Sequence, residues 1–259
     1  MTFPQYKNKH NKAPSVSPTY FTKGSKIHDK TAIFIYTRKI LAYLKKELNA
    51  KPLLGNKHEF NSLGLYEDKK RGILIVHLPI GAPITSSATD ELVSLGTKRF
   101  IIFGLAGSLR NDLTHGNVVL CSKSLRDEGS SYHYVRPKAY AHPTKNLKDK
   151  MKSLMEQEKI DFRVGPSWTI DAPYMETKSE IEHYAKKGIL TVEMESSAMF
   201  SVVERRRHEG YNLEAVAIFL ISDIVSESEK YKFINSNSDY KKYKLEDRVK
   251  EMANVFKKI

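Results

Sequence analysis

The feature that most constrains the fold is an alternation of short apolar runs with longer stretches whose apolar residues recur at helical spacing. Runs rich in β-branched residues are typical of strands buried on both faces of a sheet. They occupy Thr31–Tyr36, Gly72–Leu78, Arg99–Leu105, Asn117–Cys121, Ile189–Met194 and Ala215–Ile221. Helices are predicted over Thr37–Leu48, Thr85–Leu95, Leu147–Gln157, Glu180–Lys187, Ser196–Arg206 and Lys242–Lys257. Because strands that alternate with helices pair largely in parallel, we predict an α/β fold with a central, mostly parallel or mixed, twisted sheet flanked by helices.

The alternation runs through residues 31–259 without an internal repeat or a linker, which predicts a single domain over that range. Residues 1–30 mix Lys, Asn, Ser, Pro and Gly with little periodicity and are predicted to form a basic N-terminal arm. Hydrophobic residues make up 40% of the 259 residues, which excludes a wholly disordered chain.

Other classes of protein are excluded by features that the sequence lacks. No apolar run reaches the length of a membrane span, and the first thirty residues hold no apolar signal segment. The single cysteine, Cys121, excludes an intrachain disulfide and a multi-cysteine zinc site. No motif offers a recognisable cluster of metal ligands. We therefore expect a cytoplasmic protein that uses no metal and no organic cofactor and does not enter a membrane.

The net charge of +13 invites a nucleic-acid interpretation, but the charge is concentrated at the two ends of the chain. Residues 1–30 and 230–259 each carry +5, so the 199 residues between them carry only +3. Lys outnumbers Arg by 32 to 11, although Arg is the residue favoured for bidentate phosphate and base contacts. A solvated, solubilising surface is therefore preferred, and nucleic-acid binding is kept as a third alternative.

Five polar or glycine-containing segments follow the predicted strands, at the sheet edge where α/β proteins bind ligands. They are Pro79–Pro83, Phe103–Ser108, Ser124–Tyr134, Val192–Ser196 and Ile221–Asp223. Small residues in the first two let backbone N–H groups or a flat ligand approach closely. Taken singly, each segment also fits an ordinary turn, a surface loop or a helix cap.

The acids of the fourth segment suggest a sugar site. Glu193 and Glu195 lie on the same side of an extended chain. Ionised carboxylates only accept hydrogen bonds, so such a pair suits the vicinal hydroxyls of a sugar. The alternative is a solvated pair at a helix N-terminus, where the helix dipole favours negative charge.

Taken together and in order, these segments resemble the nucleoside phosphorylase superfamily, which includes purine nucleoside phosphorylase, uridine phosphorylase and related nucleosidases. The resemblance covers roughly residues 55–225. It rests on the stretches IGAP, FGLAGSL, RDEGSSYHY after the strand GNVV, SWTIDAPYMET, VEMES and ISD.

The resemblance implies a role for each matching position. Asp223 would be the catalytic acid that protonates N7 of a purine, so that the base leaves neutral. General acid catalysis of this kind contributes roughly two to four orders of magnitude. The ribose would be held by Glu193, Met194 and Glu195, and the base by Ala106, Gly107, Trp168, Tyr174 and Ser222. Phosphate would be held by Arg38, His58, Gly81 and Arg126.

Departures from the family pattern concern the phosphate and the base. The first strand ends without the family's Gly-Asp-Pro-x-Arg, leaving Arg38 as the counterpart of its arginine, and Ile102 stands where another phosphate arginine is often found. His58 stands where some relatives lend an arginine to the neighbouring subunit. The uracil-reading Gln-x-Arg is replaced by the stretch YMET at residues 174–177.

We therefore expect a pentosyltransferase of nucleoside metabolism that acts in purine salvage. It would cleave a nucleoside, with purine favoured, by phosphorolysis to the free base and ribose 1-phosphate. The alternatives are a hydrolytic nucleosidase and a catalytically inactive nucleoside-binding protein. The resemblance also implies a homo-oligomer, either a dimer or a hexamer.

Overall fold

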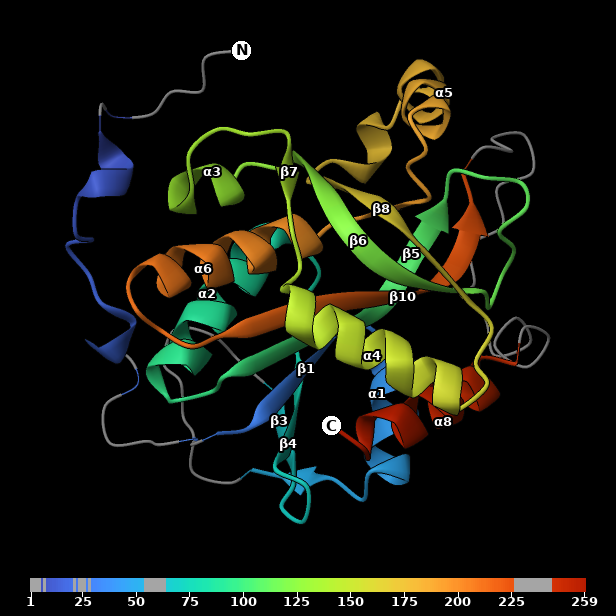
Figure 1. The fold of residues 1–259 in the computed structure, drawn as a ribbon, viewed down its shortest axis with the longest axis horizontal. Coiled ribbons are helices and arrows are strands. Elements are labelled where there is room, and N and C mark those ends of the chain that lie inside the picture. Colours follow the sequence, from blue (N-terminus) through green and yellow to red (C-terminus); the bar gives the residue numbers. More distant parts are fainter. Residues whose placement is uncertain are drawn as a thin grey trace.

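The computed structural model describes residues 6, 8–20, 22, 27, 29–53, 64–225 and 244–259, and it confirms the predicted α/β class (Figure 1). One mixed sheet runs through the molecule. Its strands are β1 Thr31–Ile35, β2 Lys51–Pro52, β3 Gly64–Asp68, β4 Ile73–His77, β5 Arg99–Ser108, β6 Val118–Asp127, β7 Tyr140–Ala141, β8 Phe162–Ile170, β9 Thr191–Glu193 and β10 Glu214–Ile224.

The strands pair in the order β10-β6-β8-β9-β5-β1-β4-β3-β2, with β7 beside β6. Strand β10 also pairs in parallel with β5. Strands β5, β9, β8, β6 and β10 therefore form a closed circuit, from which β1, β4, β3 and β2 extend as an open sheet. Parallel pairing of β4, β1, β5 and β10 brings their carboxyl ends to the same edge.

Helices cover both faces of the sheet. They are α1 Arg38–Glu47, α2 Ala82–Ser94, α3 Ser131–Tyr134, α4 Lys145–Gln157, α5 Lys178–Lys186, α6 Ser196–His208 and α8 Leu245–Phe256, with short 3-10 turns at Lys9–Asn11, Pro18–Tyr20 and Pro173–Met175. One apolar core joins α1, α4 and α8 to one face, and a second joins α2 and α6 to the other (Figure 1). None of the described helices is long and apolar enough to cross a membrane.

The structure corrects the expected ends of three strands. Strand β5 continues through Phe103–Ser108, which sequence reasoning assigned to a turn, and β6 continues into Ser124–Asp127. Strand β10 includes Ser222 and Asp223, which were expected to follow it, and a bulge lies between Ile221 and Asp223. The polar residues at these strand ends remain hydrogen-bonded to neighbouring strands, because the closed circuit of paired strands extends beyond the apolar core.

Four strands were missed entirely, of which β2 and β7 are only two residues long and β3 and β8 are longer. Strand β8 alternates between exposed and buried positions near its start, and β3 contains a glycine and two acids. Neither therefore shows the continuous apolar run by which the other strands were recognised.

The described part of the N-terminal arm lies against α2, α3 and α6. His10 Nε2 is 2.9 Å from the carbonyl oxygen of Tyr132, and Thr22 Oγ1 is 2.8 Å from Ser94 Oγ. Ile27 is buried in the core beside α2. A cavity of about 470 Å³ lies between the arm and the body. The division into an arm of residues 1–30 and a domain of residues 31–259 stays a proposal.

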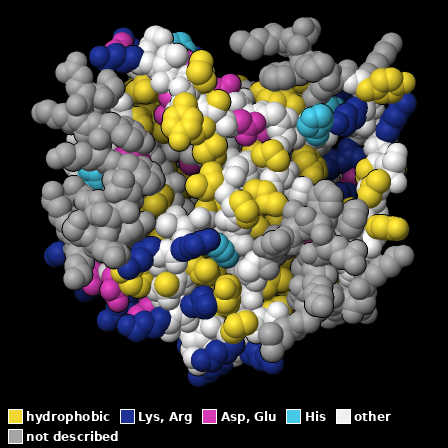
Figure 2. Space-filling model, turned by 180° about the vertical axis from the view of Figure 1, so that it is seen from behind, with side chains coloured by type: hydrophobic (Ala, Val, Ile, Leu, Met, Phe, Trp, Pro, Cys, Tyr) yellow, Lys and Arg dark blue, Asp and Glu magenta, His cyan; other side chains and the backbone are white. Residues whose placement is uncertain are grey.

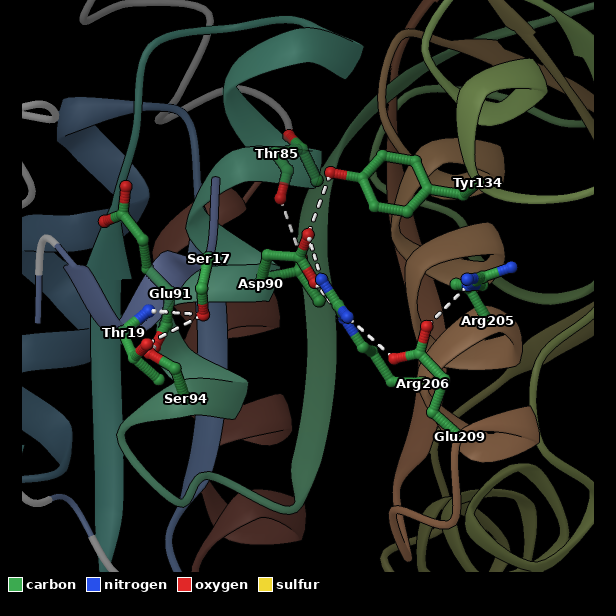
Figure 3. Close-up of polar contacts among 11 residues, drawn as sticks. Ser17, Thr19, Thr85, Asp90, Glu91, Ser94, Tyr134, Arg205, Arg206 and Glu209 are labelled. Carbon is green, nitrogen blue, oxygen red and sulfur yellow. Dashed lines mark hydrogen bonds and ion pairs between the residues drawn. The ribbon is translucent and has the colours of Figure 1, made fainter. Parts of the chain in front are cut away.

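Beside this cavity, Asp90 of α2 and Arg206 of α6 form a two-bond ion pair at 2.7 and 3.0 Å (Figure 3). Tyr134 donates to the same Asp90 carboxylate. Helices α2 and α6 both begin at the carboxyl edge of the sheet. The ion pair joins them to each other near their opposite ends.

Figure 2 shows the face of the molecule opposite to that of Figure 1. Lys and Arg side chains lie there in several separate groups, with acidic and hydrophobic side chains between them. Basic residues thus form no single continuous patch among the described residues visible there. The preference for a solubilising surface over nucleic-acid binding stays a prediction.

Candidate active site at the carboxyl edge of the sheet

A cavity of about 410 Å³ lies where the parallel strands end. It is bounded by the residues after β1, by the last part of β5, by the β9–α6 junction, by the end of β10 and by the segment before α5. Its lining residues are Tyr36, Thr37, Ile80, Leu105, Ala106, Gly107, Pro173, Tyr174, Glu176, Ile181, Val192, Glu193, Met194, Glu195, Ser222, Asp223 and Val225. The predicted sugar and base segments therefore meet at one site.

Glu195 lies two residues after the end of β9 and occupies the N-cap position of α6. Its Oε1 accepts a hydrogen bond from Gly81 N at 2.8 Å, and its Oε2 accepts one from Met194 N at 3.3 Å. Burial, followed by the charge of Glu193, raises the pKa of Glu195 to about 8. A carboxyl group with two backbone donors retains acceptor positions that a ligand hydroxyl can use.

Glu193 has a different environment although it also borders the cavity. Its Oε2 accepts from Glu195 N and Ser196 N at 2.9 and 2.7 Å. Its Oε1 accepts from the hydroxyls of Thr169 and Ser196, both at 2.6 Å, and from Ser167 Oγ at 3.3 Å. Burial raises its pKa while these hydrogen bonds oppose the shift. The carboxyl group therefore holds β8 and the start of α6 together, and the structure assigns it no open acceptor position toward a sugar.

Asp223 and Ser222 lie in β10 where its register shifts against β5. Ser222 Oγ donates to Asp223 Oδ1 at 2.5 Å, and Asp223 is only 4% exposed. A Cβ atom on Gly107 would lie 3.0 Å from Asp223 Oδ2 and 3.1 Å from Val192 Cγ1. A larger residue would have to displace Asp223 or Val192 by a few tenths of an ångström, so glycine suits this close approach of β5 to the carboxyl group.

The predicted base residues do not all reach the cavity. Ala106, Gly107, Tyr174 and Ser222 line it, and Tyr174 is 99% exposed at its rim. Trp168 does not line it. The indole is fully buried in a cluster with Ile170 and Ile181, and its Nε1 donates to Asp127 Oδ2 at 3.0 Å. The geometry thus gives Trp168 a packing position behind the site.

Arg126 is the predicted phosphate residue that the structure places elsewhere. It is 3% exposed, and its guanidinium donates to Ser131 Oγ and to the carbonyl oxygens of Val135, Arg136 and Lys138. The guanidinium also stacks on the Tyr132 ring at 4.2 Å. Arg126 therefore orders the turn after β6 and lies outside the cavity lining.

The other predicted phosphate residues give a sparse site. Gly81 N is already bonded to Glu195, and His58 lies outside the described residues. Arg38 is exposed at the first position of α1, directly after the cavity residue Thr37. Within the described residues, the cavity lining contains four acids and no Lys, Arg or His.

Two residues of the cavity lining, and a histidine near Arg38 that is not among the lining residues, were not identified from the sequence. Tyr36 is hydrogen-bonded to Thr85 at 2.9 Å, and burial and the Glu195 charge raise its pKa well above the ordinary value. Glu176 lines the cavity, and burial followed by the Asp223 charge raises its pKa to about 7. His77 ends β4 near Arg38, and burial followed by the Arg38 charge lowers its pKa. Tyr36, His77 and Glu176 lie at the ends of predicted strands or in the stretch YMET. The direction in which each side chain points depends on tertiary structure, which the sequence pattern does not give.

No group of three or more metal-ligating side chains occurs in the part of the chain that the structure describes. The cavity surface is mostly apolar. Its carboxyl groups can accept hydrogen bonds from hydroxyls and exchange protons, and the bare backbone at Gly107 leaves room for a flat ring.

Residues 34–258 match the family model of the phosphorylase superfamily. Guanosine phosphorylase from Halorubrum lacusprofundi is 27% identical over 127 residues, which span 49% of this chain and 53% of that protein. A DeoD-type purine nucleoside phosphorylase from Bacillus velezensis is 29% identical over 170 residues, which span 64% of this chain and 69% of that protein. The chain thus spans about half the length of the first relative and about two thirds of the second.

Among solved structures, uridine phosphorylase from Vibrio fischeri has a TM-score of 0.73 at 21% identity, covering 92% of this chain and 98% of its own. AMP nucleosidase from Bacteroides thetaiotaomicron has a TM-score of 0.66 at 16% identity, covering 90% and 93%. At these identities the likeness establishes the fold alone.

Proposed function

Because this chain belongs to the phosphorylase superfamily, we propose that it cleaves the N-glycosidic bond of a purine nucleoside and transfers the ribosyl group to phosphate. One observation carries the proposal: a single cavity brings the Glu193-Met194-Glu195 segment together with Asp223 and the glycine-containing end of β5. The residues expected to hold the sugar and those expected to hold the base thereby lie beside each other, as this reaction requires.

The chemistry follows from the charges that develop when the bond breaks. The sugar gains oxocarbenium character and the base gains negative charge. Asp223 is buried at the base side and is positioned by Ser222, so it would donate a proton to N7. Glu195 would accept hydrogen bonds from the ribose hydroxyls, with Met194 beneath the sugar ring. Glu193 would act through the Glu195 and Ser196 backbone, which it holds in place.

Phosphate is the first candidate acceptor because the two similar relatives above are named as phosphorylases. Arg38, which directly follows the cavity residue Thr37, would then supply positive charge, together with His58. Water is the second candidate, and a specific observation favours it. Four acids and no basic residue line the described cavity, which disfavours a doubly charged anion.

The test is to incubate the protein with guanosine, inosine, adenosine and uridine, with and without phosphate, and to separate the products by chromatography. Ribose 1-phosphate that forms only with phosphate supports the first candidate, and free ribose supports the second. Binding of a nucleoside without turnover of any nucleoside would show that the protein is a nucleoside-binding protein without this activity.

The catalytic assignment has its own variant. Asp223→Asn keeps the shape but loses the acid, so kcat on purine nucleosides should fall at least about tenfold. Asp149→Asn removes a charge from the exposed face of α4 and is the matched control. An unchanged rate in Asp223→Asn would remove Asp223 from the mechanism.

A further inference from the structure

A second cavity lies outside the candidate active site, between the N-terminal arm and helices α2, α3 and α6. Its volume is about 470 Å³ and its surface is mostly apolar. It shares no lining residue with the 410 Å³ cavity. One of its walls comes from α3, which the proposed reaction does not use. In that helix Tyr132 turns inward and donates to the Arg126 carbonyl oxygen at 2.7 Å, whereas His133 and Tyr134 line the cavity.

Two of the three acids that line this cavity are matched by arginines of α6. Arg206 donates to both carboxylate oxygens of Asp90, at 2.7 and 3.0 Å, and to Glu209 Oε2 at 2.7 Å (Figure 3). Arg205 donates to the other Glu209 oxygen, also at 2.7 Å. These four charges therefore balance one another, and the remaining side chains decide which ligands the cavity favours.

Basic groups outnumber acids among those remaining side chains. They are Lys9, His10, Lys12 and His133, against the single acid Glu91, which is 4% exposed. Among the described residues, neither lysine forms an ion pair with a carboxylate. Lys9 Nζ contacts His133 Nδ1, and Lys12 Nζ lies 4.9 Å from the centre of the Tyr6 ring. The balance is thus opposite to that of the active-site cavity, whose described lining holds four acids and no basic residue.

Lys9, His10 and His133 form a basic cluster where the arm crosses α3. Burial and then the charge of Lys9 lower the pKa of His133, and His10 adds to this effect while Glu128 opposes it. An ammonium group has no acceptor, so Lys9 donates to Nδ1 and the proton of the neutral His133 ring lies on Nε2. Within the described residues, this leaves the Nε2–H of His133 and two N–H groups of Lys9 for a ligand. A bound anion would also offset the repulsion within the cluster.

The other walls of the cavity are apolar and stiff. The arm contributes Ala13, Pro14, Val16 and Pro18. Val16 is 61% exposed, so its side chain has surface to offer a ligand. The Tyr134 ring stands opposite on α3, and its hydroxyl is fixed by donation to Asp90 at 3.0 Å (Figure 3). Such walls suit a flat or aliphatic group, whose burial is favourable.

We propose that this cavity is a second small-molecule site, which binds a phosphate monoester with an aromatic or aliphatic body. Lys9 and the His133 Nε2–H would hold the phosphate, and the body would lie between Tyr134 and the proline-containing part of the arm. A phosphate monoester carries nearly two negative charges and three acceptor oxygens, so it can use several donors at once. The site is separate from the proposed active site, and the inference does not depend on the proposed reaction.

Calorimetric titration of the full chain with phenyl phosphate, inorganic phosphate and phenol tests the proposal. Phenyl phosphate should bind more tightly than either of the others, because only it offers both the anion and the ring. In Lys9→Met its Kd should rise at least about tenfold, since a hydrogen bond between charged groups is lost. Lys9→Arg keeps the charge and should keep most of the affinity. Lys145→Met, on the exposed face of α4, is the matched control and should leave Kd unchanged.

Amide hydrogen exchange places the bound ligand. Phenyl phosphate should slow exchange in residues 8–18 of the arm and 131–135 around α3, which line or adjoin the second cavity, and should leave residues 193–196 of the candidate active site unaffected.

Three results would overturn the proposal. The first is the absence of phenyl phosphate binding at millimolar concentration. The second is phenol binding as tightly as phenyl phosphate, which would make the cavity an apolar site without anion recognition. The third is an unchanged Kd in Lys9→Met together with protection confined to residues 193–196, which would place the ligand in the candidate active site. Failure of nucleoside cleavage would leave the proposal standing, because the two cavities share no lining residue.

Discussion

Glu193 and Glu195 are separated by one residue, yet their surroundings give them different capacities. Five donors surround the first carboxyl group, whereas the second accepts from Gly81 N and Met194 N. Both are about 5% exposed. Two of the five donors, the Ser167 and Thr169 hydroxyls, come from β8, and the other three come from Glu195 and Ser196. Glu195 therefore combines burial with open acceptor positions. Burial of its charge destabilises the folded protein, and hydrogen bonds from a bound ligand can offset this cost.

That cost makes a prediction about pH. The pKa of Glu195 is raised to about 8 in the folded protein, above its ordinary value of 4.5. The folded state therefore binds more protons than the unfolded state between these values, and stability falls as pH rises from about 5 to about 8. Glu195→Gln removes this term. Its melting temperature should equal that of the unaltered protein at pH 5 and exceed it at pH 8.

Thermal melts of both proteins at several pH values check this prediction. Glu182→Gln serves as the control, because its exposed carboxyl group should give the same difference at every pH. A difference between Glu195→Gln and the unaltered protein that does not grow with pH would show that the buried carboxyl group is not held against its ordinary pKa. The variant should also bind nucleosides more weakly, since an amide accepts fewer hydrogen bonds than a carboxylate.

At this scale the sequence identified the acids and the glycines but not which way they face. Alternation correctly predicted an acid pair at the end of a strand, and it could not separate Glu193 from Glu195 because β8 was not recognised. Arg126 has the residue type of a phosphate ligand, and only the fold of residues 131–138 shows that its donors are used within the chain. In the sequence, Glu176 is recognised only as part of the stretch YMET, which replaces the uracil-reading Gln-x-Arg.

At the scale of elements, the alternation of apolar runs predicted the main strands and helices well. Helices α1, α4, α5 and α6 begin within a few residues of their expected positions. Strands β5 and β10 were predicted too short because apolar periodicity reports burial rather than pairing. Their polar ends remain hydrogen-bonded to each other, and this extension brings Gly107 beside Asp223.

The join between α2 and α6 is a further consequence of tertiary structure. Asp90 and Arg206 have side chains only 10% and 15% exposed, and the Asp90 hydrogen bonds raise the pKa of Arg206 above its ordinary value. Arg206→Met should destabilise the protein by about 2–3 kcal/mol, because it leaves a largely buried carboxylate without its cation. Chemical denaturation at neutral pH measures this change.

The exposed pair Lys145–Asp149 on α4 provides the comparison. Lys145→Met should cost less than about 0.5 kcal/mol. Adding Asp90→Asn to Arg206→Met should recover part of the lost stability, since it removes the uncompensated charge. Equal effects of Arg206→Met and Lys145→Met would show that the α2–α6 ion pair contributes no more than a surface pair.

At the scale of the molecule, the charge distribution and the location of the cavity agree. The basic excess lies in the terminal thirty residues at each end, whereas the cavity is lined by residues 36–225 and contains an excess of acids. Among the residues of the two ends that the structure describes, none lines the cavity. A homo-oligomer, either a dimer or a hexamer, stays a proposal, which light scattering of the purified protein would test.

The N-terminal arm gives the last prediction. Its described residues line the 470 Å³ cavity and none of the 410 Å³ cavity. A chain that begins at residue 21 loses the contact of His10 with the Tyr132 carbonyl but keeps Thr22 and Ile27. Its kcat/KM on the best nucleoside should stay within about twofold, because loosely packed terminal residues are tolerated losses.

Ile27→Ala in the full chain is the contrasting variant. Ile27 is 3% exposed in the core beside α2, so truncating its side chain should cost about 2–4 kcal/mol even though it lies within the first thirty residues. A small change in kcat/KM on truncation at residue 21, together with a large loss of stability in Ile27→Ala, would place the start of the folded body between residues 21 and 27. A loss of activity on truncation would instead make the arm part of the active protein, since the deleted segment contacts α3 and α6, and α6 begins directly after the cavity residue Glu195.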